Sequence, residues 1–279
     1  MERMRFFKGR NIILKALVLL IIGCAVNRFS ENRAIESMVE HDFLDISLHA
    51  DKVSYSSMHR TFFALNKQEN SIYIYKNGVF FNIIGRSGFS DDNFRRLSDI
   101  YYGVDGFLYA LDSFEKSIKK FDSDGKYIGQ ASINQISSPE RFVMTQYGSF
   151  FIFDGHSKEI IYLDPFDYSP KFTFGRFQID SVDMMFIMGD YLNIFDKDRN
   201  ITDIFYINGK HENSYRGLTF YDLFRNVLSF TDEGFRDIRR DMAVYSIPSG
   251  SFASFNIENG FYLLQSENWV RVLRVVYEM

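Results

Sequence analysis

The sequence has few of the residues that mark several classes of protein. It contains one cysteine and four prolines among 279 residues. A single cysteine excludes an intramolecular disulfide and a multi-cysteine metal cluster. The apolar run at 16–22 is much shorter than the about 20 residues that a membrane-spanning helix needs. A content of 46% hydrophobic and 24% charged residues is instead typical of a folded globular protein.

Motifs of common catalytic sites are also missing from the sequence. It has no H-E-x-x-H pair, no G-x-S-x-G elbow and no phosphate-binding P-loop. Residues 196–200 begin like a calcium loop, but Ile201 stands where the sharp turn of such a loop requires glycine. The sequence therefore predicts no catalytic residue, no cofactor and no metal site.

The first 23 residues differ from the rest. Five basic residues and one acidic residue precede the apolar run 16–22, a pattern typical of a secretory signal. The end of this run and the two residues after it, Ile21-Ile22-Gly23-Cys24, resemble the lipobox of bacterial lipoproteins. The resemblance implies a signal peptide at 1–23, an acylated tether at 24–41 and a folded body at 42–279. An uncleaved N-terminal anchor and an ordinary signal cut nearby are the alternatives.

The same resemblance has consequences for location. It implies membrane attachment through acyl chains on Cys24, and two chains are enough for stable anchoring. Ala25 follows the cysteine, where Asp often signals inner-membrane retention in that family, so we expect an outer-membrane destination in a bacterial cell envelope. Cleavage before Cys24 changes the net charge from −4 to −8. A net-negative body gives no electrostatic reason to bind nucleic acid.

A repeat of about 43 residues follows residue 50. Each copy has a run of bulky apolar residues that ends in Asp or Asn, at 61–66, 106–112, 149–154 and 190–196. The later copies are degenerate, and we place the Asp position of the fifth near Asp237. Hairpin turns such as Asn77-Gly78 and Asp124-Gly125 are expected to be of type I′, which needs positive φ at both central residues.

This period predicts an all-β fold. Repeats of about 40 to 50 residues with four strands each are typical of β-propeller blades, which bury their apolar faces by stacking around an axis. The length favours six blades, although five or seven remain possible. The last copy lacks a strand, and 42–49 is expected to supply it by pairing with 269–276 and closing the ring.

The repeat also resembles a known family. Residues 100–112, with 118–122 and 125–128, match the NHL repeat, which loosely reads as an apolar strand, D-x-x-G, I-Y-V-x-D, a gap and I-x-x-F-D. The resemblance is good over 97–175 and poor beyond 216. It implies a six-bladed propeller but no particular function, because the fold carries many functions.

Candidate binding residues come from recurrent positions. Asp112, Asp154 and Asp196 recur once per blade, and we interpret them as caps of backbone N–H groups. Four arginines are expected to gather near one mouth of the ring and to bind an anionic surface, although solvated rim charge is the alternative: Arg86, Arg176, Arg239 and Arg240.

Two functions are compatible with this sequence. The first is a lipid-anchored binding or scaffold module of the cell envelope, with a protein, peptide or glycan partner. The alternative is a propeller enzyme of the lactonase or lyase type, with a metal in its central channel. The absence of catalytic motifs favours the binding module.

Overall fold

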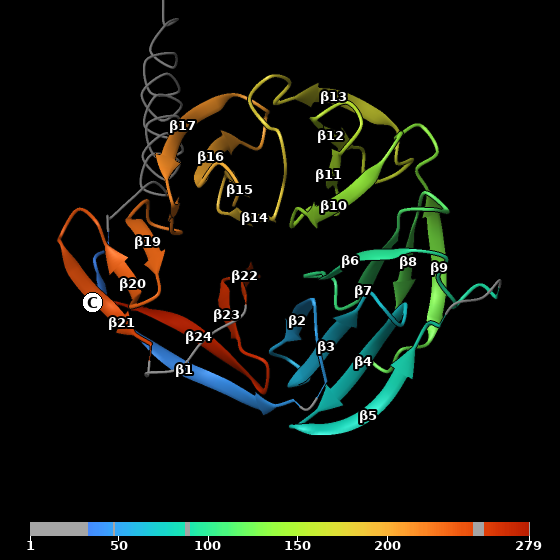
Figure 1. Ribbon diagram of the computed structural model, residues 1–279, viewed down its shortest axis with the longest axis horizontal. Helices are drawn as coiled ribbons and strands as arrows, with labels where there is room; N and C mark the ends of the chain where they lie inside the picture. The colour runs from blue at the N-terminus through green and yellow to red at the C-terminus, as the bar shows by residue number, and fades with distance from the viewer. Residues whose placement is uncertain (1–32, 47, 87–89, 248–253, 279) are drawn as a thin grey trace, which may run out of the picture.

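The computed structural model describes residues 33–46, 48–86, 90–247 and 254–278, which form a ring of six sheets (Figure 1). Each sheet is antiparallel and has four strands. The expected all-β, six-bladed propeller is therefore confirmed. Within the described part of the chain, no helical segment is long and apolar enough to cross a membrane.

Five blades take their strands in chain order, with the first strand nearest the axis in four of them. The first two blades consist of β2 (Lys52–Ser56), β3 (Thr61–Asn66), β4 (Ser71–Lys76) and β5 (Val79–Ile84), and of β6 (Leu97–Tyr102), β7 (Leu108–Asp112), β8 (Ser117–Phe121) and β9 (Tyr127–Ser132). The next two consist of β10 (Pro139–Met144), β11 (Phe150–Asp154), β12 (Glu159–Leu163) and β13 (Pro170–Phe174), and of β14 (Met184–Met188), β15 (Tyr191–Asp196), β16 (Ile201–Tyr206) and β17 (His211–Arg216). The fifth consists of β18 (Leu218–Tyr221), β19 (Val227–Thr231), β20 (Gly234–Asp237) and β21 (Met242–Ser246).

The last blade closes the ring with both ends of the folded body. It contains β22 (Ser254–Glu258), β23 (Phe261–Gln265), β24 (Trp269–Tyr277) and, as its outermost strand, β1 (Ile35–Asp45). Pairing of Asp42 with Val272 and of Asp45 with Trp269 confirms the expected closure.

The predicted boundaries of this closing strand need correction. β1 begins at Ile35 rather than at residue 42, so 35–41 belong to the propeller and not to a tether. The polar residues of 35–41 point outward on an edge strand, while Ile35 and Met38 are buried. Because so few residues of this segment are apolar, the sequence did not indicate a strand there. At the other end, the strand stops at Asp45, and 46–49 lie beyond it.

The repeated Asp residues cap backbone groups, as expected. The Asp112 carboxylate accepts hydrogen bonds from the N–H groups of Arg95 and Arg96, before the blade, and of Phe114 and Glu115, in its own hairpin. Asp154 likewise accepts from residues before its blade and from its own hairpin. These carboxylates tie the entry of each blade to its second hairpin.

The turns follow the prediction only in part. Asn77 and Gly78 both have positive φ, 50° and 78°, as a type I′ turn requires. Gly125 has positive φ but Asp124 is not among the residues with positive φ, and the Gly125 N–H donates to the Asp122 carbonyl. This turn is of the longer kind in which a type I turn precedes a left-handed glycine.

The blade β18–β21 is set back from the axis (Figure 1). β14 lies against β22, the first strand of the blade beyond it, while β18 lies against β15, β16 and β17. Five strands therefore surround the axis: β2, β6, β10, β14 and β22. Phe220 of β18 fills the space between neighbours, with ring centroids 5.3 Å from Phe186 and 6.0 Å from Tyr262.

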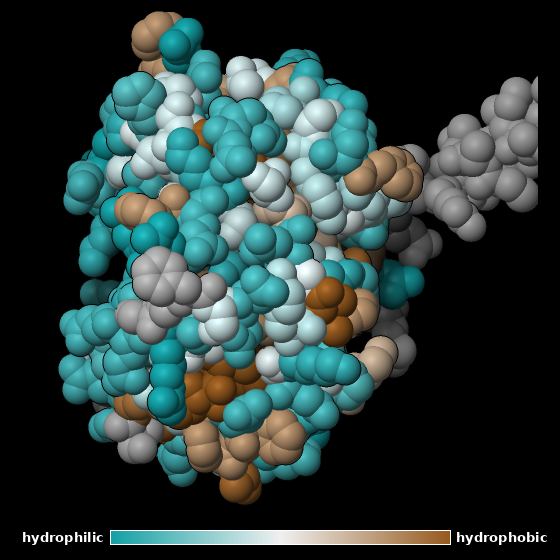
Figure 2. Space-filling view, turned by 90° about the vertical axis from the view of Figure 1, so that its right-hand side faces the viewer, coloured by the Kyte–Doolittle hydropathy of each residue, from teal (hydrophilic) through white to brown (hydrophobic). Residues whose placement is uncertain are grey.

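The outer rim is protected unevenly. On the edge strand β5, Val79, Phe80 and Phe81 are exposed, whereas β13 begins with Pro170 and β17 carries mainly polar residues. Figure 2 views the side where β5 and β9 lie, and hydrophobic residues gather in its lower part. Polar residues and proline discourage pairing of an edge with another chain, and β5 lacks them at its first three positions.

Candidate functional site

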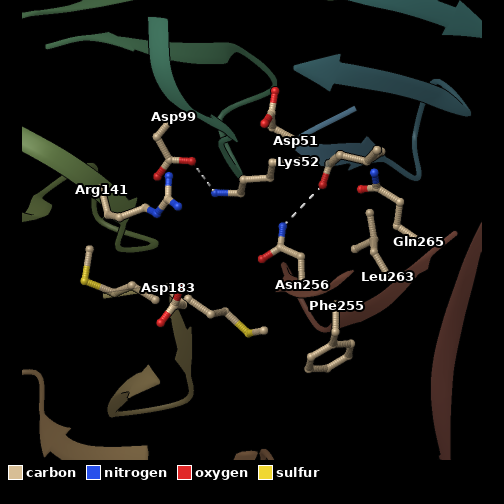
Figure 3. Close-up of a pocket in the computed structure, with 12 residues that line it drawn as sticks. Asp51, Lys52, Asp99, Arg141, Asp183, Phe255, Asn256, Leu263 and Gln265 are labelled. Atoms are coloured by element: carbon tan, nitrogen blue, oxygen red, sulfur yellow. Dashed lines mark hydrogen bonds and ion pairs between the residues drawn. The ribbon is translucent and has the colours of Figure 1, made fainter. Parts of the chain in front are cut away.

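The two ends of the ring carry different hollows. We call the end at which the five axial strands begin the entry face, and the end at which they finish the exit face. On the entry face, a small pocket of about 80 Å³ lies on the axis and is named the axial pocket (Figure 3). The residues that line it are Asp51, Lys52, Val53, Asp99, Arg141, Asp183, Met184, Met185, Phe255, Asn256, Leu263 and Gln265.

Three strands bring charged groups into the axial pocket. Lys52 comes from the start of β2, Asp99 from β6 and Arg141 from β10 (Figure 3). The Lys52 Nζ donates to the Asp99 carboxylate at 2.8 Å, and Asp99 is 1% exposed. The second Asp99 oxygen accepts the N–H of Phe142 at 3.0 Å. The charge of Lys52 is thus compensated inside the protein.

Arg141 differs from Lys52 in this respect. Its Nη1 donates to the Ser98 carbonyl at 3.2 Å, and its buried Nε has no hydrogen-bond partner. Among the described residues, no carboxylate forms an ion pair with Arg141. A partly buried cation with unused donors favours an anion beside it, because desolvating an uncompensated charge is costly.

Other charged groups surround this guanidinium. Burial and the neighbouring Arg141 charge both lower the pKa of Lys67, with burial the larger cause. Asp51 and Asp183 also line the axial pocket, and each uses one carboxylate oxygen to accept a backbone N–H, from Lys67 and Lys197 respectively. These two carboxylates are the groups against which an anionic ligand competes.

Two larger hollows adjoin the axial pocket on the entry face. One, of about 480 Å³, shares Arg141 with it and lies beside Lys67 and Arg96. The other, of about 780 Å³, shares Asp183, Met184 and Phe255 with it. We call this second hollow the interblade cavity, because it lies where the blade β18–β21 is set back. The axial pocket is therefore the centre of a wider depression.

A buried carboxylate lies deeper along the axis. Glu258, at the end of β22, accepts hydrogen bonds from the Ser54 hydroxyl at 2.6 Å and from the Tyr102 N–H at 2.5 Å. Burial raises the pKa of Glu258 to about 7, and the positive charge of Lys52 opposes that shift. Glu258 thus links β22 to β2 and β6 in the interior, where it has a structural role.

The exit face has a hollow of about 310 Å³ with a more apolar rim. Val104, Tyr147 and Leu223 lie on it and are each more than half exposed. The polar groups at this mouth are few and uncharged apart from Asp190. The hollow on the exit face is therefore mainly apolar, whereas charged side chains line the axial pocket on the entry face.

The four predicted arginines do not gather near one mouth. Arg86 and Arg176 follow the outermost strands β5 and β13 on the entry face, and Arg176 lies 3.4 Å from Glu159. Arg239 and Arg240 lie in the β20–β21 hairpin on the exit face, where Arg240 pairs with Glu278 at 2.7 Å. The expected cluster fails because the hairpin that carries Arg239 and Arg240 follows the third strand of its blade, which points the opposite way from the second.

The sequence reasoning missed Arg141 and Lys52. The available signal was a charged residue just before, or at the start of, an apolar first strand, since such positions face the mouth of a propeller. Each blade uses a different residue there, so a search for recurrent positions passes over them. Cys24 and Ala25 lie outside the described residues, and lipid attachment stays a prediction.

The described residues contain no group of three or more His, Cys, Asp or Glu side chains placed to hold a metal ion. The channel-metal alternative therefore gains no support from this part of the chain. The charged side chains that line the axial pocket are two cations, Lys52 and Arg141, and three acids, Asp51, Asp99 and Asp183.

Comparison with known proteins identifies the fold only. No protein-family model and no curated protein matches the chain, so the likeness to the NHL repeat stays a resemblance. Among solved structures, the chain is similar to the crystal structure of a "putative exported protein" from Bacteroides fragilis NCTC 9343. The TM-score is 0.57 and the identity 11%, over 90% of this chain and 98% of that one.

Proposed function

We propose that this protein is an exported binding module that holds an anionic group of its ligand in the axial pocket. The observation that carries the proposal is Arg141, whose guanidinium lines the pocket without a carboxylate partner among the described residues. The volume of about 80 Å³ suits a carboxylate rather than a whole ligand. Arginine pairs with carboxylates through two parallel hydrogen bonds, which favours this chemistry.

The rest of the ligand lies outside the axial pocket in this proposal. Propeller faces are broad and rigid, and the adjoining hollows on the entry face extend the contact surface. A protein, peptide or glycan that carries a carboxylate meets these requirements. The Bacteroides fragilis structure supports export, since it has the same fold and its name reads "putative exported protein".

A titration with matched ligands tests the proposal. The probe is the peptide acetyl-Ala-Ala-Gly, as the free acid and as its C-terminal amide, followed by NMR shifts of the folded protein. We expect the acid to bind at least tenfold more tightly, because only the acid can pair with Arg141. In the variant Arg141→Gln, the acid and the amide should bind equally weakly.

Arg86→Gln and Arg176→Gln are matched controls, because both arginines lie on the same face but away from the axial pocket. Each should leave the affinity for the acid unchanged within twofold. Equal binding of acid and amide by the unmodified protein would overturn the proposal. So would tighter binding of an amine, which would show that Asp51 and Asp183 dominate the pocket.

We also propose that Cys24 anchors the module to a membrane. The support is the basic start, the apolar run and the lipobox-like Ile21-Ile22-Gly23-Cys24. The variant Cys24→Ser should lose labelling by a fatty-acid analogue and accumulate as uncut precursor. Normal processing and membrane retention of this variant would contradict the proposal.

The identity of the membrane is a separate part of this proposal. Ala25 after the cysteine supports the outer membrane, by resemblance to lipoproteins in which Asp at that position retains the protein in the inner membrane. Fractionation of cells should therefore find the protein with the outer membrane, and Ala25→Asp should move it toward the inner membrane. Recovery of the unmodified protein wholly in the inner membrane would contradict this assignment.

A further inference from the structure

The interblade cavity is the largest hollow among those of the described residues discussed above, and it arises from a departure from propeller symmetry. Because β14 lies directly against β22, the blade β18–β21 does not reach the axis. The space of about 780 Å³ that results opens on the entry face, between the β15–β16 hairpin and the β19–β20 turn. This volume is within the range of sites for drug-sized ligands.

The walls of the cavity are apolar and its rim is polar. Five of its lining residues are bulky and apolar: Met184, Phe195, Leu218, Phe230 and Phe255. Phe230 and Phe255 are stacked, with ring centroids 4.6 Å apart and planes at 18°. Both rings belong to a larger aromatic cluster that reaches Tyr262, so this wall is rigid.

The rim carries charges of both signs. Lys197 and Arg216 have side chains for which the described residues provide no ion pair. Asp183 and Asp232 lie on the same rim, and Asp183 already accepts the Lys197 N–H. Neither acid forms an ion pair among the described residues, so the rim charges balance. The preference for a negatively charged ligand group therefore comes from Arg141 in the adjoining pocket.

The cavity and the axial pocket share a wall. Asp183, Met184 and Phe255 line both, so a ligand group in one is adjacent to a ligand group in the other. The axial pocket is sized for a carboxylate, and the interblade cavity for a bulky side chain. We propose that the ligand is a peptide whose carboxylate binds Arg141 while a neighbouring large apolar side chain fills the interblade cavity, an inference that rests on the proposed function.

A peptide fits this pair of sites better than a glycan or a fatty acid. Phe195, Phe230 and Phe255 make an apolar wall that a large apolar side chain covers completely, whereas a sugar ring also turns hydroxyl groups toward it. Asn200, Ser229 and Thr231 place polar groups around the cavity, and these suit the amides of a peptide better than an acyl chain.

The test compares ligands that differ in one group. Acetyl-Ala-Ala-Phe, acetyl-Ala-Ala-Gly and laurate, all as free acids, are titrated against the folded protein. We expect the Phe peptide to bind at least tenfold more tightly than the Gly peptide, because a buried aromatic ring removes a large apolar surface from water. Laurate should bind more weakly than the Phe peptide.

A cavity-filling variant locates the ring. Ser229→Phe should bring the affinity for the Phe peptide down to that for the Gly peptide and leave the Gly peptide unaffected. Ser132→Phe, on the exposed outer strand β9, is the matched control and should change neither affinity.

A spectroscopic readout covers the case in which Ser229→Phe does not fold. With ¹³C-labelled methionine methyl groups, the Phe peptide should shift Met184, which lines both sites, and not Met58, which is 84% exposed in the β2–β3 turn of the exit face. Equal affinities for the Phe and Gly peptides, with Arg141→Gln still weakening both, would overturn this inference but keep the proposed function. Loss of the Arg141 effect would overturn the proposed function instead, and tighter binding of laurate than of the Phe peptide would replace the peptide with a lipid.

Discussion

The blades β6–β9 and β18–β21 have the same strand order but different relations to the axis. In β6–β9, Asp112 accepts four backbone N–H groups, two from the segment that enters the blade and two from the second hairpin. In β18–β21, Asp237 accepts only the N–H groups of Arg239 and Arg240 in its own hairpin, and its Oδ2 has no partner. The capping carboxylate has moved from the second strand to the third.

This difference in capping accompanies the displacement of the blade β18–β21 from the axis. A carboxylate at the end of the second strand fixes the segment that leads to the axis, because it holds both the hairpin and the entering chain. Without that link, β18 lies against the neighbouring sheet, and packing of Phe220 between Phe186 and Tyr262 holds the blade instead. Hydrogen-bonded caps therefore hold the blade β6–β9, whereas aromatic packing holds the blade β18–β21.

The largest effect is expected from opening the ring, on which both regions depend. Deletion of 270–279 removes most of β24, including the buried Val270, Val272 and Leu273. It leaves β1 without a partner and β23 paired only with β22. We expect loss of the cooperative thermal transition, because two long strand edges become exposed. Differential scanning calorimetry measures it.

A shorter truncation is the control. Ending the chain at Tyr277 removes only Glu278 and Met279, and Glu278 contributes one surface ion pair with Arg240. This variant should melt within a few degrees of the full chain. An unchanged melting temperature after the longer deletion would show that ring closure by β24 is unnecessary.

The caps give the next largest effect and test the comparison directly. Asp154→Ala removes a carboxylate that accepts from Ser137, Ser138 and His156, and should cost about 3 kcal/mol of unfolding free energy. Asp237→Ala removes a cap of a single hairpin and should cost about 1 kcal/mol. Urea unfolding of both variants measures the difference, and equal losses would refute the role assigned to the link between hairpin and entering chain.

The buried Glu258 gives an effect that depends on pH. Its pKa of about 7 in the folded protein lies above the ordinary value of 4.5, so the folded state keeps a proton that the unfolded state has lost. The stabilisation is therefore complete below about pH 4.5 and disappears as the pH rises through about 7. Glu258→Gln removes this dependence, and its stability relative to the unmodified protein should rise by up to about 3 kcal/mol between pH 4.5 and 8.

Urea unfolding of both proteins at the two pH values checks this result, since the other titrating groups cancel in the difference. The ring of five axial strands is the region concerned, because Glu258 joins β22 to β2 and β6. A stability difference that is the same at both pH values would show that the carboxyl does not titrate in this range.

The smallest effect on stability is expected at the outer rim. Val79→Lys with Phe81→Lys should leave the melting temperature nearly unchanged, because both side chains are about half exposed or more. The charges should reduce self-association at high concentration, since an apolar edge strand is open to pairing. Analytical ultracentrifugation measures it, and identical association of the variant and the unmodified protein would show that β5 is not a contact.

The fold could be predicted where local chemistry repeats. Asp112, Asp154 and Asp196 recur because three blades use the same cap, and residues 42–49 were assigned to closure because the last repeat lacked a strand. The strands of the fifth blade could not be assigned from the repeat. Asp237 lies at the expected spacing, but it ends the third strand of its blade, whereas Asp112, Asp154 and Asp196 end the second strand of theirs. A period counts residues along the chain and does not register which strand of a sheet they occupy.

The candidate site was harder to predict than the fold. Arg141 is one residue in one blade, and its significance comes from the lack of a carboxylate opposite it, which only three-dimensional contacts reveal. The predicted Arg86 and Arg176 share a position after their blades' outermost strands, but that position lies away from the axis. Repetition identified the scaffold, whereas binding depends on the positions at which the blades differ.

The place where β1 begins determines which face of the propeller an N-terminal anchor would be attached to. Ile35 pairs with Tyr277 at the exit face, whereas Gln265 and Phe255 of the same blade line the axial pocket at the opposite face. About ten residues separate Ile35 from Cys24, and a fully extended chain spans at most about 3.6 Å per residue. A lipid on Cys24 would therefore hold the start of β1 within about 36 Å of the bilayer, and its attachment point on the body would be at the face opposite the pocket with Arg141.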